Sequence, residues 1–439
     1  MITKTKTIGF RFGDKHKAYI KSCRDNMYNI AEGAVRAGKT VDNVFAFAQE
    51  LKNTEDKIHI ATGSTIANAK LNIGDANGFG LEYIFRNQCK WGKYKSNECL
   101  YIKGPSTKNK LKIVIFSGGA KADSFKKIRG NSYGMWIATE INLHHENTIK
   151  EVFNRTIAAK KRKIFWDLNP DNPNAVIYKD YIDKYKKKNE EGELLGGYNY
   201  EHFTIDDNIN ISDERREEIK SQYDKTSIWY RRDILGERCI AEGLIYRKFA
   251  DHYEKYLDNN VMNLWEIIVG VDFGGTGSAH AFVAVGITHD YREVIALSSE
   301  RHTGDIDPEG LNKIFIDFIK KIQHKYGYVS YAYCDSAEQV LIRGFKNAAY
   351  KEGIDTSIRN SLKEPINERI NLTSRLIAQD RFKYTDDCET LVEAMRTSIW
   401  NPKEITKNER LDDGTTDVDT LDAFEYTIER YTRKLLNAI

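Results

Sequence analysis

The stretch Gly33–Thr40 constrains the fold of this chain most, because it matches the pattern G-x-x-x-x-G-K-[ST] in full. Glycines at both ends of such a loop let successive backbone N–H groups surround an anion, while Lys39 adds a positive charge and Thr40 offers a hydroxyl to Mg²⁺. A short strand can precede the loop, and apolar residues recur at helical spacing over 41–48. The pattern predicts a phosphate-binding loop, with ATP held by Gly33, Ala37, Gly38, Lys39 and Thr40.

Further strand patterns follow the loop. Apolar segments begin near residues 57, 111, 133, 163 and 200 and alternate with helical patterns. Such alternation predicts an α/β domain with a mostly parallel sheet and a nucleotide at the carboxyl ends of its strands. The tract 74–104 is rich in glycine, asparagine and aromatic residues, and we expect an insertion with hairpins there, outside the core.

The predicted strand 133–140 ends on a carboxylate, as does the strand that carries the water-activating acid in phosphate-loop enzymes. Glu140 is therefore the candidate general base. Thr139 stands where an aspartate usually holds Mg²⁺, so metal binding is expected to depend on Thr40, Glu140 or water. After the strand 163–168, Asn169 is placed to sense the γ-phosphate.

Two arginines are candidates for stabilising charge on the transferring phosphoryl group. Arg36 lies within the loop itself, and Arg129 precedes the strand that ends at Glu140. The sequence does not choose between them. Phe12, His16, Tyr19 and Tyr28 are possible stacking partners for an adenine ring.

A second set of strands begins near residue 266, and acidic residues end two of them. Asp272 follows the first strand, and Asp335 follows a strand that begins near residue 329. Asp419 and Asp422, three residues apart, share one face of a predicted helix. Three short strands in succession suggest a ribonuclease H-like meander, and the four carboxylates suit two Mg²⁺ or Mn²⁺ ions that cleave a phosphodiester. Asp419 has a second interpretation, as a simple helix cap.

The segment Asp272–Thr276 also resembles the first phosphate loop of sugar kinases and actin-like ATPases. Those enzymes need a second glycine-rich loop, usually Asp-x-Gly. Here Asp335 is followed by Ser336, Ala337 and Glu338, which disfavours that alternative.

Length and composition agree with two domains. A chain of 439 residues exceeds one ordinary core. We predict an ATPase domain over 1–205, a polar connector over 206–253 and a nuclease domain over 254–439. The scattered cysteines argue against a zinc site, and no run of about 18 apolar residues predicts a membrane span. Net charge is nearly neutral, but Lys160–Lys163 and Lys184–Lys188 form basic clusters that could meet DNA phosphates.

A phosphate-loop ATPase followed by a ribonuclease H-like acidic set resembles the large terminase subunit of tailed bacteriophages. The resemblance covers nearly the whole chain, and Tyr230–Tyr246 and Leu372–Ile377 resemble other signatures of that family. It implies an ATP-driven translocase of double-stranded DNA joined to an endonuclease that cuts concatemers. In some relatives an arginine at the place of Arg129 reaches the neighbouring subunit. Asp419 departs from the family, in which a histidine often occupies that position.

The same resemblance implies a small terminase subunit and the portal protein of the procapsid as partners, with a ring of copies only during packaging. It also implies a place in the host cytoplasm, transiently at the portal, and absence from the mature virion. Two alternatives stay open. One is a helicase-like DNA-dependent ATPase with an inactive second domain, and the other is a DNA-binding scaffold with degenerate sites.

Overall fold

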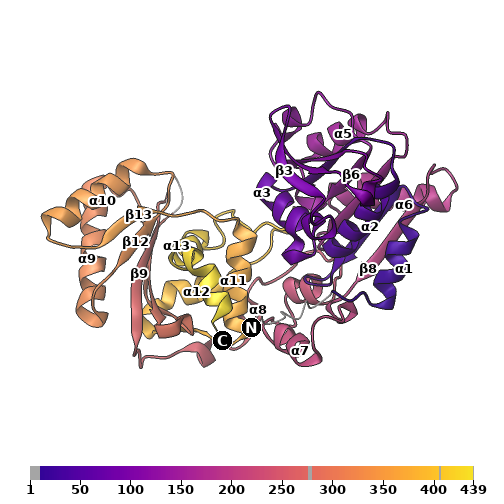
Figure 1. Ribbon diagram of the computed structural model, residues 1–439. Coiled ribbons are helices and arrows are strands. Elements are labelled where there is room, and N and C mark those ends of the chain that lie inside the picture. The colour runs from indigo at the N-terminus through magenta and orange to yellow at the C-terminus, as the bar shows by residue number, and fades with distance from the viewer. Residues whose placement is uncertain (1–9, 275–278, 405–406, 439) are drawn as a thin grey trace, which may run out of the picture. The chain divides into compact units, whose positions relative to one another are not determined.

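The computed structural model describes residues 10–274, 279–404 and 407–438, which fold as two compact units, each built on one sheet (Figure 1). Unit 1 contains the chain up to Glu217 together with Arg231–Cys239. Unit 2 contains Glu218–Tyr230 and the chain from Ile240 onward. The stretch 206–253, predicted as a connector, is thus shared between the two units.

Unit 1 holds an eight-stranded sheet in the order β3-β4-β5-β2-β6-β7-β1-β8. All pairs are parallel except β3 with β4 and β4 with β5, so the sheet is mostly parallel, as predicted. The strands are β1 (Tyr28–Gly33), β2 (Ile58–Gly63), β3 (Cys89–Tyr94), β4 (Asn97–Ile102), β5 (Lys112–Gly118), β6 (Met135–Ala138), β7 (Lys163–Leu168) and β8 (Tyr198–Phe203).

The predicted insertion is wrong in one respect. The hairpin β3–β4 lies within 74–104, but β4 pairs with β5 and buries Cys99, Leu100 and Ile102 completely. The hairpin therefore extends the core sheet. The sequence did not predict that the hairpin belongs to the core sheet, because the polar and aromatic residues of β3 resemble those of a solvent-exposed loop.

Helices cover both faces of this sheet because adjacent residues of a buried strand point to opposite sides. In β7, Phe165 contacts Phe47 of one helix, whereas Trp166 contacts Phe153 of another. The helices of unit 1 are α1 (Asp14–Ser22), α2 (Lys39–Asn53), α3 (Ile66–Ala69), α4 (Leu81–Ile84), α5 (Glu146–Arg155) and α6 (Asp183–Glu190), and α7 (Asp213–Ser221) spans the division along the chain.

Unit 2 holds a six-stranded sheet in the order β13-β12-β9-β10-β11-β14. Strands β9, β10 and β11 form an antiparallel meander, and β12 runs parallel to β9 on its other side. This is the ribonuclease H-like arrangement that the sequence predicted. The strands are β9 (Leu264–Asp272), β10 (His280–Thr288), β11 (Val294–His302), β12 (Tyr331–Cys334), β13 (Ser357–Asn360) and β14 (Phe382–Tyr384).

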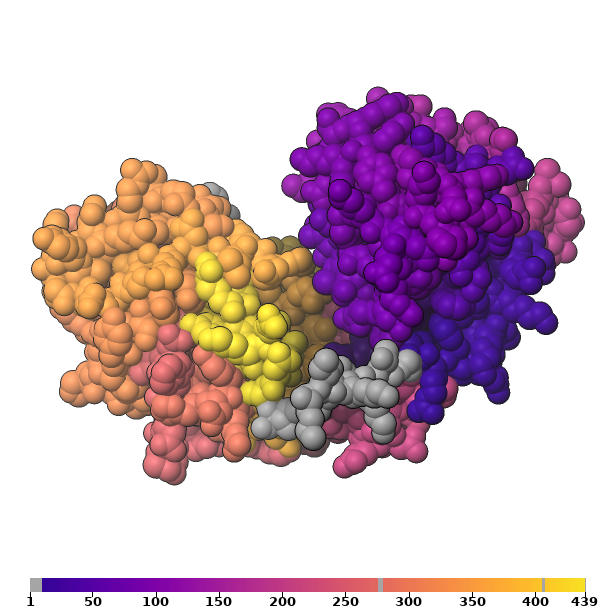
Figure 2. Space-filling view, viewed as in Figure 1, coloured from indigo at the N-terminus to yellow at the C-terminus, as the bar shows by residue number. Residues whose placement is uncertain are grey.

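Two hydrophobic clusters lie on the two faces of the second sheet. Val269 and Val271 of β9 pack with α9 and α10, while Ile268, which precedes Val269, packs in the cluster of α11, α12 and α13 (Figure 1). The yellow C-terminal residues are visible at the surface among the orange segments of this unit (Figure 2). Its helices are α8 (Arg247–Asp251), α9 (Pro308–Tyr326), α10 (Gln339–Lys351), α11 (Ile366–Ala378), α12 (Glu389–Thr397), α13 (Val418–Ile428) and α14 (Thr432–Asn437).

None of the helices in the described ranges is both long enough and apolar enough to cross a membrane.

Candidate functional site

The loop Gly33–Thr40 leaves the carboxyl end of β1 and enters α2, whose first residue is Lys39. Gly33 and Gly38 have φ angles of 148° and 97°, which L-residues with a side chain rarely adopt. The loop backbone is also held from outside, because the Val35 N–H donates to the Asp233 carbonyl at 2.9 Å. The loop conformation therefore places the N-terminus of α2 at the loop, an arrangement that binds phosphate.

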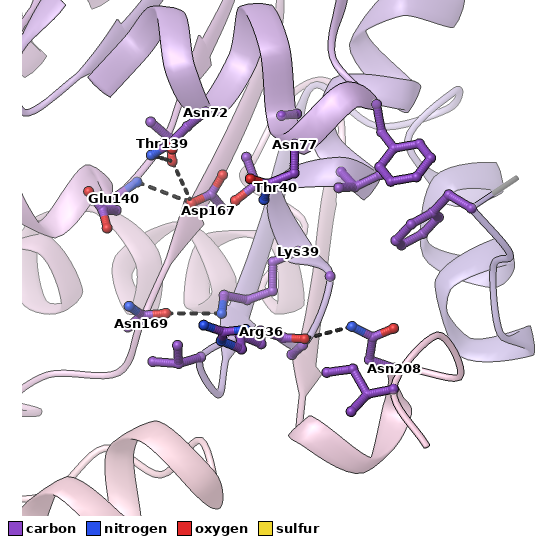
Figure 3. Close-up of a pocket in the computed structure, with 18 residues that line it drawn as sticks. Arg36, Lys39, Thr40, Asn72, Asn77, Thr139, Glu140, Asp167, Asn169 and Asn208 are labelled. Atoms are coloured by element: carbon purple, nitrogen blue, oxygen red, sulfur yellow. Dashed lines mark hydrogen bonds between the residues drawn. The ribbon is translucent and has the colours of Figure 1, made fainter. Parts of the chain in front are cut away.

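A cavity of about 380 Å³ lies over this loop. Its wall combines the loop with residues from the ends of β6 and β7 (Figure 3). The cavity is lined by Phe10, Val35, Arg36, Ala37, Gly38, Lys39, Thr40, Val41, Asn72, Ala76, Asn77, Phe79, Thr139, Glu140, Asp167, Asn169, Asn208 and Ile211. The predicted loop residues other than Gly33 therefore share one cavity with Glu140, Asn169 and Arg36.

Lys39 is held at the base of this cavity by three oxygen atoms. Its Nζ donates to the carbonyls of Gly33 and Ala34 at 2.9 and 2.5 Å, and to Asn169 Oδ1 at 3.0 Å. Burial lowers the pKa of Lys39 to about 8, although the nearby carboxylates, with Asp167 first, act to raise it. The contact with Asn169 links the phosphate loop directly to the end of β7.

Glu140 directly follows Thr139, at the end of β6, in a left-handed conformation with φ 52°. Burial and the negative charge of Asp167 raise the pKa of its carboxyl group, and Lys39 opposes that rise. A carboxylate with a raised pKa at the cavity wall suits a group that accepts a proton from water. The non-glycine positive φ is local strain of the kind that concentrates at functional sites.

Asp167 is a cavity residue that the sequence interpretation missed. It lies in β7, is buried, and its Oδ1 accepts hydrogen bonds from Thr139 Oγ1 at 3.2 Å and the Glu140 N–H at 3.1 Å. Burial raises its pKa, against the lowering effects of the Glu140 N–H, Lys39, Thr40 and Thr139. The sequence offered only a partial signal: a buried acid in a mostly apolar strand is costly unless it is paired or binds a cation, but the sequence does not show which strand lies beside β6.

The two candidate arginines have different surroundings. Arg36 lines the cavity with a φ of 61°. Arg129 is not among the cavity residues, and its side chain is 57% exposed, with Nε 3.5 Å from Glu151 Oε1 and its guanidinium over the Phe125 ring. Arg36 therefore lies at the cavity and Arg129 does not, and which of the two acts on a nucleotide stays a prediction.

Other side chains around the loop also differ from expectation. The aromatic rings that line the cavity are Phe10 and Phe79, whose centroids are 5.2 Å apart, rather than the four aromatic residues proposed to stack on adenine. Before the loop, the buried Glu32 accepts hydrogen bonds from Tyr178 and Tyr200 and forms an ion pair with Arg238 at 2.6 Å. This network anchors the end of β1.

The basic cluster Lys160–Lys163 is largely occupied within unit 1. Lys160 pairs with Glu55 at 2.7 Å, and Lys161 pairs with Glu50 at 3.0 Å. Lys163 is buried and donates to backbone carbonyls, including that of Arg24 at 2.8 Å. These contacts weaken the expectation that this cluster binds DNA phosphates.

In unit 2, the predicted acids lie around the end of β9. Asp272 ends this strand, and Asp335 follows the adjacent parallel strand β12, with its N–H donating to the Val271 carbonyl at 2.9 Å. Helix α13 carries Asp419 and Asp422 close to the same edge. The approach is tight, because a Cβ on Gly270 would lie 1.8 Å from the Ala423 carbonyl oxygen.

Electrostatics connect the four acids. Asp272 is 8% exposed, and burial, followed by the charges of Asp422, Asp335 and Asp419, raises its pKa to about 8. Tyr426 donates to Asp272 Oδ1 at 3.3 Å. Crowded carboxylate oxygens are the ligands that Mg²⁺ and Mn²⁺ prefer, so the chemistry of these residues fits divalent ions.

The carboxylates are nevertheless engaged by other contacts. Lys363 pairs with Asp335 at 2.5 Å, and the Ala279 N–H donates to Asp419 Oδ2 at 2.8 Å. Within residues 10–274, 279–404 and 407–438, no group of three or more His, Cys, Asp or Glu side chains is arranged to hold a metal ion. Gly275 and Thr276 of the kinase-like segment lie outside the described residues.

A buried ion cluster, also missed from the sequence, fixes Asp422. Arg410 and Arg369 both contact Asp422 Oδ1, the latter at 2.9 Å, and both pair with Glu425 at 2.9 and 2.8 Å. The side chains of Arg410 and Glu425 are 1% and 0% exposed. Such a cluster orients Asp422 but neutralises part of its charge.

The residues around the phosphate loop match a known protein family. A family model described as "Terminase large subunit, T4likevirus-type, N-terminal" matches residues 30–250, just over half of the chain. No curated protein matches the chain.

Solved structures of the large terminase from a thermophilic bacteriophage have a similar fold. One has a TM-score of 0.79 at 20% identity and covers 95% of this chain and 99% of that chain. A complex of the same phage protein with ATP-γ-S has a TM-score of 0.75 at 19% identity and covers 95% and 100%. At this identity the structural similarity establishes the fold alone, and it is the match to the family model that assigns the chain to a family. The chain belongs to the large terminase subunit family of tailed bacteriophages.

Proposed function

We propose that this chain is a DNA-packaging motor subunit that hydrolyses ATP in unit 1 to move double-stranded DNA into a procapsid and cuts concatemeric DNA in unit 2. One observation carries the proposal: Lys39, Glu140 and Asn169 share a cavity with the phosphate loop at the carboxyl edge of the parallel strands. The large terminase of the thermophilic bacteriophage has been solved with ADP and with ATP-γ-S, which supports the same ligand here.

The polar and charged residues around the phosphate loop have distinct roles in this proposal. The loop N–H groups and Lys39 bind the β- and γ-phosphates, and Thr40 faces the Mg²⁺ ion that accompanies them. Glu140 accepts a proton from the attacking water, and Asn169, already bonded to Lys39, responds to the γ-phosphate. Arg36 neutralises charge within the same subunit, whereas Arg129 acts on a neighbouring copy if a ring forms.

The nuclease activity is assigned to Asp272, Asp335, Asp422 and Asp419. Two Mg²⁺ or Mn²⁺ ions would supply an activated water and stabilise the leaving oxygen. Asp272 is the central residue, because the charges of the other three act on it. Asp335 and Asp422 are each paired with a basic side chain. To bind a metal ion directly, each carboxylate would have to give up part of that ion pair; otherwise it would contact the ion through water.

Family membership supports a proposal for the partners of this chain and for where it acts. We infer that the chain acts with a small terminase subunit and the portal protein, as a homo-oligomeric ring only while packaging. It would work in the host cytoplasm at the portal and be absent from the mature virion. No membrane partner is proposed.

A second candidate is a helicase-like DNA-dependent ATPase with an inactive second unit. It is favoured by the two arginines and the lysine that neutralise Asp422 and Asp335. That candidate predicts strand separation and no metal-dependent cutting of plasmid DNA.

The change Glu140→Gln tests the ATPase assignment. The amide keeps the size of the side chain but cannot accept a proton from water, so turnover should fall by about 10² or more while ATP still binds. Binding is measured by fluorescence titration with a labelled nucleotide, and hydrolysis by phosphate release. If the variant hydrolysed ATP at the wild-type rate, Glu140 would not be the base; if it failed to bind ATP, its role would be structural.

A further inference from the structure

The position normally occupied by a metal-holding acid in this class of site is neutral here. Thr139 directly follows β6, and a threonine cannot offset the charge of a divalent ion. Directly beside it, β7 runs parallel to β6, with Ala138 paired to Trp166. This register places Asp167 next to Thr139, and Thr139 Oγ1 donates to Asp167 Oδ1 at 3.2 Å.

We propose that Asp167 supplies, from the adjacent strand, the carboxylate that residue 139 lacks, and that it would hold the Mg²⁺ ion of the bound nucleotide through the water shell of that ion. The proposal rests on the proposed ATPase function. Mg²⁺ keeps several of its waters in nucleotide sites, so a carboxylate close to the phosphate loop acts on it through hydrogen bonds to those waters.

The two carboxylate oxygens of Asp167 have different surroundings. Oδ1 is occupied by Thr139 Oγ1 and the Glu140 N–H. Oδ2 is buried and makes no hydrogen bond of ordinary geometry to a described residue; the Thr40 hydroxyl, which acts to lower the pKa of the Asp167 carboxyl, is the donor group beside it. The Asp167 side chain lines the cavity. A buried carboxylate oxygen without a partner is rare and costly in a folded protein. A hydrated cation in the cavity would supply the missing donors.

The neighbours of Asp167 are those that such a role requires. Figure 3 shows Asp167 between Thr139 and Thr40, and the Thr40 side chain is among the groups that interact with the Asp167 carboxyl. Lys39 is close enough for its charge to act on Asp167. The acid therefore lies between the hydroxyl that binds the ion and the residue next to the general base, on the wall of the same cavity.

A structural role is the competing explanation. By accepting from the Glu140 N–H, Asp167 supports the left-handed backbone at Glu140. The change Asp167→Asn separates the two roles, because the amide oxygen can still accept both hydrogen bonds at Oδ1 while the negative charge is lost. A purely structural role leaves the Mg²⁺ dependence of nucleotide binding unchanged.

The test measures the affinity of a fluorescent ATP-γ-S analogue in EDTA and across a Mg²⁺ titration. The wild type should bind more tightly with Mg²⁺. Asp167→Asn should match the wild type in EDTA but require about 10- to 100-fold more Mg²⁺ for the same gain. Asp167→Asn combined with Thr139→Asp should recover much of the loss, because it returns an acid to the usual strand. An unchanged Mg²⁺ requirement in Asp167→Asn would overturn the proposal.

Failure of the proposed function would look different, because the wild type itself would then bind no nucleotide, either in EDTA or with Mg²⁺.

A measurement on the wild type covers the case in which the variants do not fold. In crystals grown with Mn²⁺ and the analogue, the anomalous peak should lie about 4 Å from the Asp167 carboxylate, one water away. A peak bound to Glu140 and remote from Asp167 would contradict the proposal.

Discussion

At the scale of single residues, Asp272 shows most clearly that a group suited to bind a metal ion can lower the stability of the fold. Its pKa is raised to about 8 by burial and by three neighbouring carboxylates, so the folded protein holds a proton that the unfolded chain releases near pH 4. Between about pH 4 and pH 8 the unfolded state therefore binds fewer protons at this position, and stability falls as pH rises. Without a metal, Asp272 therefore stays mostly protonated up to about pH 8, and a bound cation would offset the cost of ionising it.

This gives a prediction for Asp272→Asn. In EDTA at pH 8 the variant should be more stable than the wild type by on the order of 2 kcal/mol, and the difference should shrink as pH falls toward 5. Mn²⁺ should raise the unfolding temperature of the wild type and leave that of the variant unchanged. Calorimetry with and without Mn²⁺ measures both effects. If the stabilities of the two proteins changed with pH in the same way, the pKa of Asp272 would not be raised in the folded protein.

At the scale of elements, the approach of α13 to β9 sets the distance between Asp272 and the acids of the helix. Gly270 makes the approach possible, since a Cβ there would lie 1.8 Å from the Ala423 carbonyl oxygen. A backbone atom cannot move aside alone, so any side chain at position 270 must displace the helix.

Gly270→Ala should therefore lower the unfolding free energy by roughly 1–3 kcal/mol and weaken Mn²⁺-dependent stabilisation. Gly286→Ala on β10 is the matched control, because the three atoms nearest to its Cβ would all belong to the Leu264 side chain, which can change rotamer. Chemical denaturation and Mn²⁺ titration compare the two variants. Equal losses in both would mean that the contact between α13 and β9 does not position the acids.

The elements also show how far the sequence could predict this protein. The phosphate loop, the central strands and the acids at strand ends follow local patterns, so the fold of each unit was predicted. Asp167 was missed because its importance depends on which strand lies beside β6, and that order is set by packing over the whole sheet. Arg369 and Arg410 were missed for the same reason, since they meet Asp422 only in three dimensions.

At the scale of the whole molecule, we assign two chemistries to two sheets within one chain. The phosphate loop and its cavity belong entirely to unit 1, and the carboxylate cluster belongs entirely to unit 2. Each chemistry should therefore be removable without loss of the other.

The most direct measurement is a comparison of ATP hydrolysis and Mn²⁺-dependent plasmid nicking in wild type, Lys39→Ala and Asp272→Asn. Lys39→Ala should lose about 10² or more in ATP turnover, because it removes the charge that stabilises the β- and γ-phosphates, and should nick plasmid as the wild type does. Asp272→Asn should hydrolyse ATP normally and fail to nick. ATPase activity of Lys39→Ala within about two-fold of wild type, or nicking by Asp272→Asn, would contradict this assignment.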